Sequence, residues 1–304
     1  MTSDHVIATG FSFPEGPCFD QEGVLHVVEL AAGCVSRVVG GKRIVLAELG
    51  GSPNGAAFGR DGFLYVCNNG GYWPAAASTG YRHGLGGGPG LIQRVGPDGS
   101  FATVIAEIGG APLNSPNDIC FDDHGGFYFT DPKWAPRRED LSLDMGVLSP
   151  GSVCYGAPSG EAVRIDTEIL FPNGLSVTDN GSSLIVDETG TGRIFRFPIL
   201  DPGCLGEPEL YADLGPDATP DGMCFDQDER LYVAGHGSNS VYVVAAGGGV
   251  VEEVISFEDA EITNVCFGGP DYCVLFVTQA VHGRVVSVNR RVPGMYLFPD
   301  RTAR

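Results

Sequence analysis

Short apolar runs alternate with polar, glycine-rich turns along this chain, and one stretch shows the pattern clearly. The polar residues Pro116, Asn117 and Asp118 precede the apolar run Ile119-Cys120-Phe121. A turn over residues 122–126 then leads into a second apolar run at residues 127–130. Two apolar runs joined by a short turn rich in Asp and Gly predict a β-hairpin, here one with a polar head.

This unit, a polar head followed by two apolar strands, occurs six times. The heads with their first strands cover residues 14–19, 53–58, 116–121, 172–177, 220–225 and 262–267. Second strands are expected at residues 24–28, 63–66, 127–130, 184–186, 231–234 and 274–278. Third strands are expected at 34–39, 91–95, 152–155, 193–197, 240–244 and 283–288, and fourth strands at 43–47, 101–106 and 250–257. Four strands repeated six times, at about 50 residues per unit, predict an all-β fold: a six-bladed β-propeller with four-stranded blades around a central channel.

A ring of blades has to close, because an open seam leaves unpaired strand edges. We expect the strand His5–Thr9, which precedes the first unit, to pair with the sheet of the last unit. No helical segment or linker interrupts the repeats, so residues 1–304 are predicted to form a single propeller domain.

Two units are longer than the others, because an insertion follows their second strand. One insertion covers residues 68–89 and the other residues 132–150. Loops that leave the same end of a propeller meet over the channel mouth, so these two could form a lid or a wall for a substrate. Ordinary surface loops are the alternative.

Composition and charge exclude several classes of partner. The 46 glycines among 304 residues follow no collagen-like period and favour many turns. A formal net charge of −20 would repel nucleic acid and anionic membranes, so we expect neither as a partner. The sequence shows no apolar segment as long as a membrane span and no secretory leader.

The nine cysteines are scattered without Cys-x-x-Cys spacing. Cys18, Cys120, Cys224 and Cys266 lie inside apolar runs, where an unpaired cysteine behaves as a small hydrophobe. We therefore expect reduced, structural cysteines and a cytoplasmic protein.

The polar heads carry the candidate chemistry. The first strand of each propeller blade lines the channel, so residues at the same position of each head are expected to converge, namely Glu15, Asn54, Asn117, Asn173, Asp221 and Thr263. In any single copy, Asn or Asp after proline could be only a turn residue. Glu is a poor turn residue, however, and converging carboxylates repel each other unless a cation lies between them. A set of oxygen donors without His or Cys suits Ca²⁺, Mg²⁺ or Mn²⁺ better than a structural zinc ion.

Several motifs carry a resemblance to a known family. They are Glu15-Gly16-Pro17, the run from Asn114 to Asp118 with Phe129-Thr130-Asp131-Pro132, Pro172-Asn173-Gly174-Leu175, and Asp221-Gly222. With these motifs in this order, residues 13–288 resemble the gluconolactonase family that includes senescence marker protein 30 (regucalcin).

The resemblance implies a six-bladed propeller with one divalent metal ion in its channel. The implied ligands are Glu15, Asn173 and Asp221, with Asn117 as a fourth ligand or as a contact to bound water and substrate. Ca²⁺ is the first expectation, with Mg²⁺, Mn²⁺, Zn²⁺ and Fe²⁺ as alternatives. Asn54 rests on the repeat pattern alone.

The resemblance also implies hydrolysis of a small lactone, in the first instance a sugar lactone. The metal would polarise the ester carbonyl and activate water, with Asp221 as general base. Ser115 stands where animal members of the family have Arg, so the sugar-lactone preference does not follow from the resemblance. Two alternatives stay open: the same site acting on phosphoesters or organophosphates, and a metal-binding propeller without catalysis.

Further substrate contacts are predicted at Asn117, Asn54, Asp131, Asn69 and His236. Asp131 and Asn69 follow second strands, where capping and turn chemistry is the alternative role. His236 ends the second strand of the fifth unit and could face the channel mouth, although a surface histidine is the ordinary case.

Overall fold

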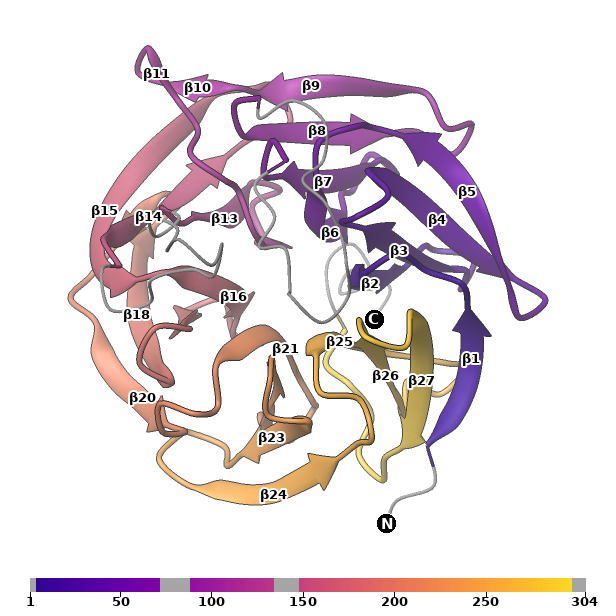
Figure 1. Cartoon of the computed structure of the whole chain (residues 1–304). Helices are drawn as coiled ribbons and strands as arrows, with labels where there is room; N and C mark the ends of the chain where they lie inside the picture. Colours follow the sequence, from indigo (N-terminus) through magenta and orange to yellow (C-terminus); the bar gives the residue numbers. More distant parts are fainter. Residues whose placement is uncertain (1–3, 72–87, 134–147, 297–304) are drawn as a thin grey trace, which may run out of the picture.

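The structure, a computed structural model, describes residues 4–71, 88–133 and 148–296. In these ranges the chain forms strands and no helix, and therefore none long and apolar enough to cross a membrane. Six sheets stand around a central channel as the blades of a propeller (Figure 1). The predicted all-β, six-bladed fold is confirmed.

The first three blades each contain four strands in sequence order from the channel outward. Blade one consists of β2 (Pro14–Phe19), β3 (Leu25–Glu29), β4 (Cys34–Val39) and β5 (Lys42–Glu48). Blade two consists of β6 (Pro53–Phe58), β7 (Leu64–Asn68), β8 (Leu91–Val95) and β9 (Phe101–Ile105). A short ribbon, β10 (Glu107–Ile108) with β11 (Ala111–Pro112), leads to blade three, which consists of β12 (Ile119–Phe121), β13 (Phe127–Asp131), β14 (Pro150–Gly156) and β15 (Ala162–Leu170).

The last three blades follow the same plan with two variations. In blade four, β16 (Pro172–Val177), β17 (Ser183–Glu188) and β18 (Arg193–Asp201) are followed by β19 (Cys204–Leu205) and β20 (Glu209–Asp213), which both pair with β18. Blade five consists of β21 (Pro220–Phe225), β22 (Leu231–Gly235), β23 (Ser240–Val244) and β24 (Val251–Ser256). Blade six takes its outer strand from the start of the chain and consists of β25 (Ile262–Gly268), β26 (Val274–Gln279), β27 (Arg284–Asn289) and β1 (His5–Thr9).

Strand β1 closes the ring. It pairs antiparallel with β27, from His5 opposite Ser287 to Thr9 opposite Arg284. Figure 1 shows β1 beside β27 at the outer edge of the last blade. The closure predicted from the sequence is confirmed, and the last sheet is completed by the first strand of the chain.

Five of the six inner strands contain a bulge at their polar head. In β2, Glu15 lies opposite Val28 and Cys18 lies opposite His26, so two residues of β2 stand against one residue of β3. The register shifts at the corresponding place in β6, β16, β21 and β25. A bulge bends the strand and re-aims the neighbouring side chain. In blade three the ladder begins only at Ile119, so Asn117 and Asp118 precede it.

Glycine follows the polar residue in four heads because neighbouring inner strands approach each other closely there. A Cβ atom on Gly16 would lie 2.7 Å from the main-chain oxygen of Asn54. A Cβ atom on Gly174 would overlap the main-chain oxygen of Asp221. The Pro-x-Gly motif therefore serves close packing around the channel as well as a change of backbone direction.

Apolar side chains fill the space between adjacent blades. Between blades two and three, for example, the ring of Tyr65 lies 5.2 Å from that of Phe121 and 5.4 Å from that of Phe127. All nine cysteines are unpaired, as predicted.

The two long insertions lie mostly outside the described residues. Residues 72–87 belong to the first insertion and residues 134–147 to the second. The proposed lid or substrate wall therefore stays a prediction.

Candidate functional site

The polar heads supply a set of buried oxygen and amide groups at the channel. Each of these residues has at most 7% of its surface exposed: Glu15, Asn54, Asn117, Asn173, Asp221 and Thr263. The negative charge of Asp221 raises the pKa of Glu15, and the side chain of Asn173 donates a hydrogen bond to Asp221. Blades one, four and five therefore bring the three expected metal ligands together.

Two further carboxylates, Asp118 and Asp187, belong to the same cluster. The negative charge of Asp118 raises the pKa of Glu15, Asp187 and Asp221. The side chain of Asn264 forms hydrogen bonds with both Glu15 and Asp118, so blade six also contributes.

Sequence reasoning missed both of these carboxylates, although each had a signal. Asp118 occupies the head position where four other blades have glycine. Asp187 is the only charged residue at its position in the second strands, where the other blades have Val28, Cys67, Thr130, Ala234 and Thr278.

Burial and mutual repulsion disfavour the charged forms of these carboxyls. Burial raises the pKa of Glu15 well above its usual range, and the carboxylates of Asp221 and Asp118 raise it further. Burial, and then the charges of Asp187 and Asp118, do the same to the pKa of Asp221. Burial raises the pKa of Asp118 to about 7. Among the residues that the structure describes, no Arg, Lys or His forms an ion pair with any of the four carboxyls.

Several buried atoms of the cluster lack a hydrogen-bond partner. They are the Oδ1 atom of Asn173 and both carboxylate oxygens of Asp187. The N–H groups of Gly174 and Asn173 lie near Asp187 and act to lower its pKa, but burial outweighs them. A buried oxygen without a partner is costly, so these atoms suit a site that is completed by a cation or by water.

The donor set determines which ion would fit. Within residues 4–71, 88–133 and 148–296, no three His, Cys, Asp or Glu side chains gather closely enough to hold a metal ion by themselves. The expected set of Glu15, Asn173 and Asp221 combines two carboxylates with an amide oxygen. Such oxygen donors fit a hard divalent ion, and Ca²⁺ accepts a mixture of carboxylate, amide and water ligands.

The remaining members of the ring have other contacts. Thr263 uses its hydroxyl in a joint between blades six and one, with Oγ1 donating to the carbonyl of Pro14 at 2.8 Å and lying 2.7 Å from Oγ1 of Thr278. Asn117 is held through its main chain, because its N–H donates to Thr130 and its carbonyl accepts the N–H of Gly55. The roles of Asn117 and Asn54 toward metal or substrate stay predictions.

Asp131 lies in a capping arrangement. Its carboxylate is fully buried, accepts the main-chain N–H groups of Asn114 and Ser115 at 2.9 and 2.8 Å, and pairs with Arg164 at 3.1 Å. The end residues of other second strands accept loop N–H groups in the same way, namely Glu29, Asn68 and Glu188. This geometry favours the capping alternative over a substrate contact.

The other two predicted substrate contacts differ in their surroundings. Asn69 is buried, and its Nδ2 group has no hydrogen-bond partner. The ring of His236 lies 6.2 Å from that of Phe13, which connects blade five to blade one. Burial lowers the pKa of His236, so its imidazole is neutral at pH 7.

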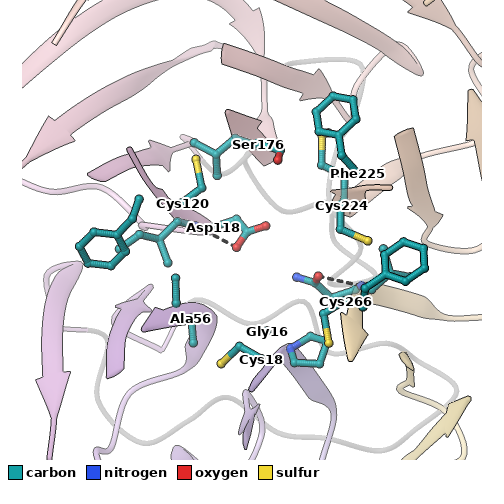
Figure 2. A pocket seen from close by; sticks show the side chains of 18 of the residues that line it. Gly16, Cys18, Ala56, Asp118, Cys120, Ser176, Cys224, Phe225 and Cys266 are labelled. Atoms are coloured by element: carbon teal, nitrogen blue, oxygen red, sulfur yellow. Dashed lines mark hydrogen bonds between the residues drawn. The ribbon is translucent and has the colours of Figure 1, made fainter. Parts of the chain in front are cut away.

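On one side of the carboxylates, the channel becomes an apolar pocket lined by all six inner strands. Figure 2 shows Asp118 at this pocket, with Cys18, Cys120, Cys224 and Cys266 around it. Burial raises the pKa of the Cys18, Cys224 and Cys266 thiols, so they stay neutral at pH 7. The polar chemistry of the channel is therefore concentrated at the heads of the inner strands.

Comparison with known proteins gives a consistent assignment. The family model of the SMP-30/gluconolactonase/LRE-like region matches residues 13–281. The chain is 27% identical over 287 residues to diisopropyl-fluorophosphatase of Loligo vulgaris, covering 87% of this chain and 85% of that protein. It is 29% identical over 250 residues to lactonase drp35 of Staphylococcus saprophyticus, covering 79% of this chain and 69% of that protein.

Solved structures share the fold. A calcium-binding regucalcin from Agrobacterium tumefaciens has a TM-score of 0.77 at 18% identity, covering 97% of this chain and 96% of that one. A gluconolactonase from Xanthomonas campestris has a TM-score of 0.73 at 24% identity, covering 95% and 89%. Since the family model spans most of the sequence, and as the motifs of the polar heads predicted, this chain belongs to the SMP-30/gluconolactonase/LRE-like family.

Proposed function

We propose that the protein is a metal-dependent hydrolase that opens a small lactone, with a sugar lactone as the first candidate. The observation that carries this proposal is the meeting of Glu15, Asn173 and Asp221 in a buried cluster of carboxylates. No Arg, Lys or His side chain of the described residues pairs with this cluster. Family membership and the lactonase relative support the same reaction class.

Glu15, Asn173 and Asp221 would hold one divalent ion, with Ca²⁺ as the first candidate. When bound, this ion would supply Lewis-acid polarisation of the ester carbonyl. Burial excludes bulk water from the three side chains, which strengthens their electrostatic interactions.

Asp221 is the proposed general base. Asn173 donates to its carboxylate and fixes its orientation, and burial with the nearby Asp187 charge raises its pKa, which makes the carboxylate a stronger base. Asp221 would take a proton from the attacking water as the new C–O bond forms at the carbonyl carbon. It would return that proton to the ring oxygen as the acyl–oxygen bond breaks, which yields a hydroxy acid.

An organophosphate substrate is the second candidate, because diisopropyl-fluorophosphatase is a relative along 85% of its own length. Initial rates on a panel of lactones and on a phosphofluoridate would decide between the two. Faster turnover of lactones supports the proposal, and turnover of the phosphofluoridate alone would replace it. Activity on neither, with metal binding retained, would favour a non-catalytic metal-binding propeller.

The nine unpaired cysteines support the further proposal that the protein works in the reducing cytoplasm.

A further inference from the structure

Three of the inner strands are preceded by a non-glycine residue with left-handed backbone. The φ angle is +58° at Phe13, +60° at Phe171 and +40° at Thr219. Each of these residues directly precedes the proline of a polar head. Two positions later stand the three expected metal ligands, Glu15, Asn173 and Asp221.

The other three blades differ at this position. Ser52, Ser115 and Glu261 correspond to the three left-handed residues, and none of them has a positive φ. Their heads carry Asn54, Asn117 and Thr263. The left-handed backbone therefore divides the six heads into the same two groups as the expected ligand set.

This conformation is unfavourable for the residues that adopt it. A left-handed φ brings Cβ close to the following carbonyl, and it is a clear outlier for a β-branched residue such as Thr219. Phe has no polar group and Thr is β-branched, so neither offers the amide or carboxyl group that eases this conformation in Asn and Asp. Such strain persists only where surrounding contacts hold it, and it gathers at functional sites.

The shared hydrogen bonding of the blades does not require the strain. The carbonyls of Phe13, Phe171 and Thr219 accept the N–H groups of Leu30, Thr189 and His236 at 3.1, 3.3 and 3.0 Å. Ser52 and Glu261 accept the N–H groups of Asn69 and Ala280 at 3.0 and 2.9 Å in the same way. Because these two residues form the bond with an ordinary φ, the bond alone does not explain the left-handed backbone.

Side chains at the ends of second strands hold the residues before Phe13 and Phe171, as Asn68 and Asp131 also do for the loops of blades two and three. In blade one, Glu29 accepts the N–H of Ser12 at 2.8 Å, directly before Phe13. In blade four, Glu188 accepts the N–H of Leu170 at 2.6 Å, directly before Phe171.

In blade five, His236 contacts both the main chain and the side chain of Thr219. Its N–H donates to the Thr219 carbonyl, and its own carbonyl accepts the Thr219 hydroxyl. The Phe13 ring also lies 6.2 Å from the ring of His236, so this histidine lies against two of the three left-handed residues.

We propose that Phe13, Phe171 and Thr219 are positioning residues, whose left-handed backbone aims Glu15, Asn173 and Asp221 at one divalent cation. This inference rests on the proposed function and deepens it. The three left-handed residues distinguish these ligands from Asn54, Asn117 and Thr263, which follow residues without a positive φ.

Thr219 offers the sharpest test because it is small and half-buried. In Thr219→Gly the left-handed backbone becomes easy to adopt, whereas Thr219→Val keeps the β-branch and loses the hydroxyl bond to His236. Thr219→Ala keeps a Cβ atom without the branch. Glu261→Val, at the corresponding position of blade six, is the matched control on relaxed backbone.

The measurement is calorimetric titration of each full-length variant with Ca²⁺, accompanied by thermal melting in chelator. We expect Thr219→Val to bind Ca²⁺ at least about tenfold more weakly than the natural chain. Thr219→Gly should stay within about threefold, Thr219→Ala should lie between them, and Glu261→Val should be unchanged. A purely structural role would lower the melting temperature in chelator without changing the Ca²⁺ affinity.

The outcomes separate this inference from the proposed function. Natural Ca²⁺ affinity in Thr219→Val, or equal weakening in Glu261→Val, would overturn the positioning role and leave the metal site intact. Should Thr219→Val fail to fold, equal affinity of the Ala and Gly variants would overturn it. Absence of binding by the natural chain to Ca²⁺, Mg²⁺ or Mn²⁺ would overturn both proposals.

Discussion

The hydroxyl of Thr130 donates a 2.8 Å hydrogen bond to the main-chain carbonyl of Asn173, across the boundary between blades three and four. Its oxygen also accepts the N–H of Asp118 at 3.0 Å. One buried side chain therefore holds the backbone of a proposed ligand and that of a neighbouring carboxylate.

Replacing this hydroxyl should weaken both stability and metal binding. Thr130→Val keeps the shape but leaves two buried backbone groups unpaired, which costs about 1–3 kcal/mol for each group. We expect a lower melting temperature and about tenfold weaker metal binding in a calorimetric titration. Thr130→Ser, which keeps the hydroxyl, is the control, and natural metal affinity in Thr130→Val would show that Asn173 needs no such support.

Substituting the proposed base should separate turnover from metal binding. Asp221→Asn keeps an oxygen donor but cannot accept the proton of the attacking water. We expect kcat on a lactone to fall by about 10²- to 10⁴-fold, with a smaller loss of metal affinity. Steady-state kinetics at saturating metal checks this, and retained turnover in the metal-loaded variant would remove Asp221 as the base.

The carboxylate cluster should make the metal-free protein less stable as pH rises. Burial raises the pKa of Glu15, Asp118, Asp187 and Asp221 above the unfolded values, so the folded state binds more protons. This contribution is complete below about pH 4 and is lost as pH rises through the folded values.

For Asp118 alone, a shift from 3.8 to about 7 corresponds to about 4 kcal/mol at 1.36 kcal/mol per pH unit. Melting temperatures in chelator should therefore fall from about pH 5 to about pH 8. Asp118→Asn should flatten this dependence, and an identical profile in the variant would exclude Asp118 as a contributor.

Asp131 should behave as a structural residue. Asp131→Ala would leave the Arg164 guanidinium without its carboxylate and two loop N–H groups without an acceptor. We expect this to lower the free energy of unfolding by about 3–5 kcal/mol. We expect a much lower melting temperature and a KM within about twofold of the natural value. Asp131→Asn, which keeps one acceptor oxygen, should lose less stability. A raised KM at natural stability would instead support the substrate contact predicted from the sequence.

The architecture could be read from the sequence because the repeat is visible there. Five of the six heads have the same order of proline, polar residue and apolar run, and the strand at residues 5–9 precedes the first head, where it is free to complete the last blade. The same alignment placed Glu15, Asn173 and Asp221 at equivalent positions, which the structure brings to one cluster.

The rest depends on contacts that a pattern does not encode. The hydroxyl of Thr263 donates a hydrogen bond to the carbonyl of Pro14, which lies 249 residues away in the chain. Asp187 joins the cluster only because of the register in which β17 pairs with β16. The left-handed backbone of Phe171 has no signal in its residue type, since Phe seldom adopts it.

The central claim is that one divalent ion at Glu15, Asn173 and Asp221 supports lactone hydrolysis. The most direct measurement is lactone turnover by chelator-treated protein during stepwise return of Ca²⁺, with calorimetric binding recorded in parallel. We predict that chelation lowers turnover by at least about a hundredfold and that activity returns in proportion to occupancy of a single site. Full turnover in metal-free protein, or binding of Ca²⁺ without any return of activity, would contradict the account.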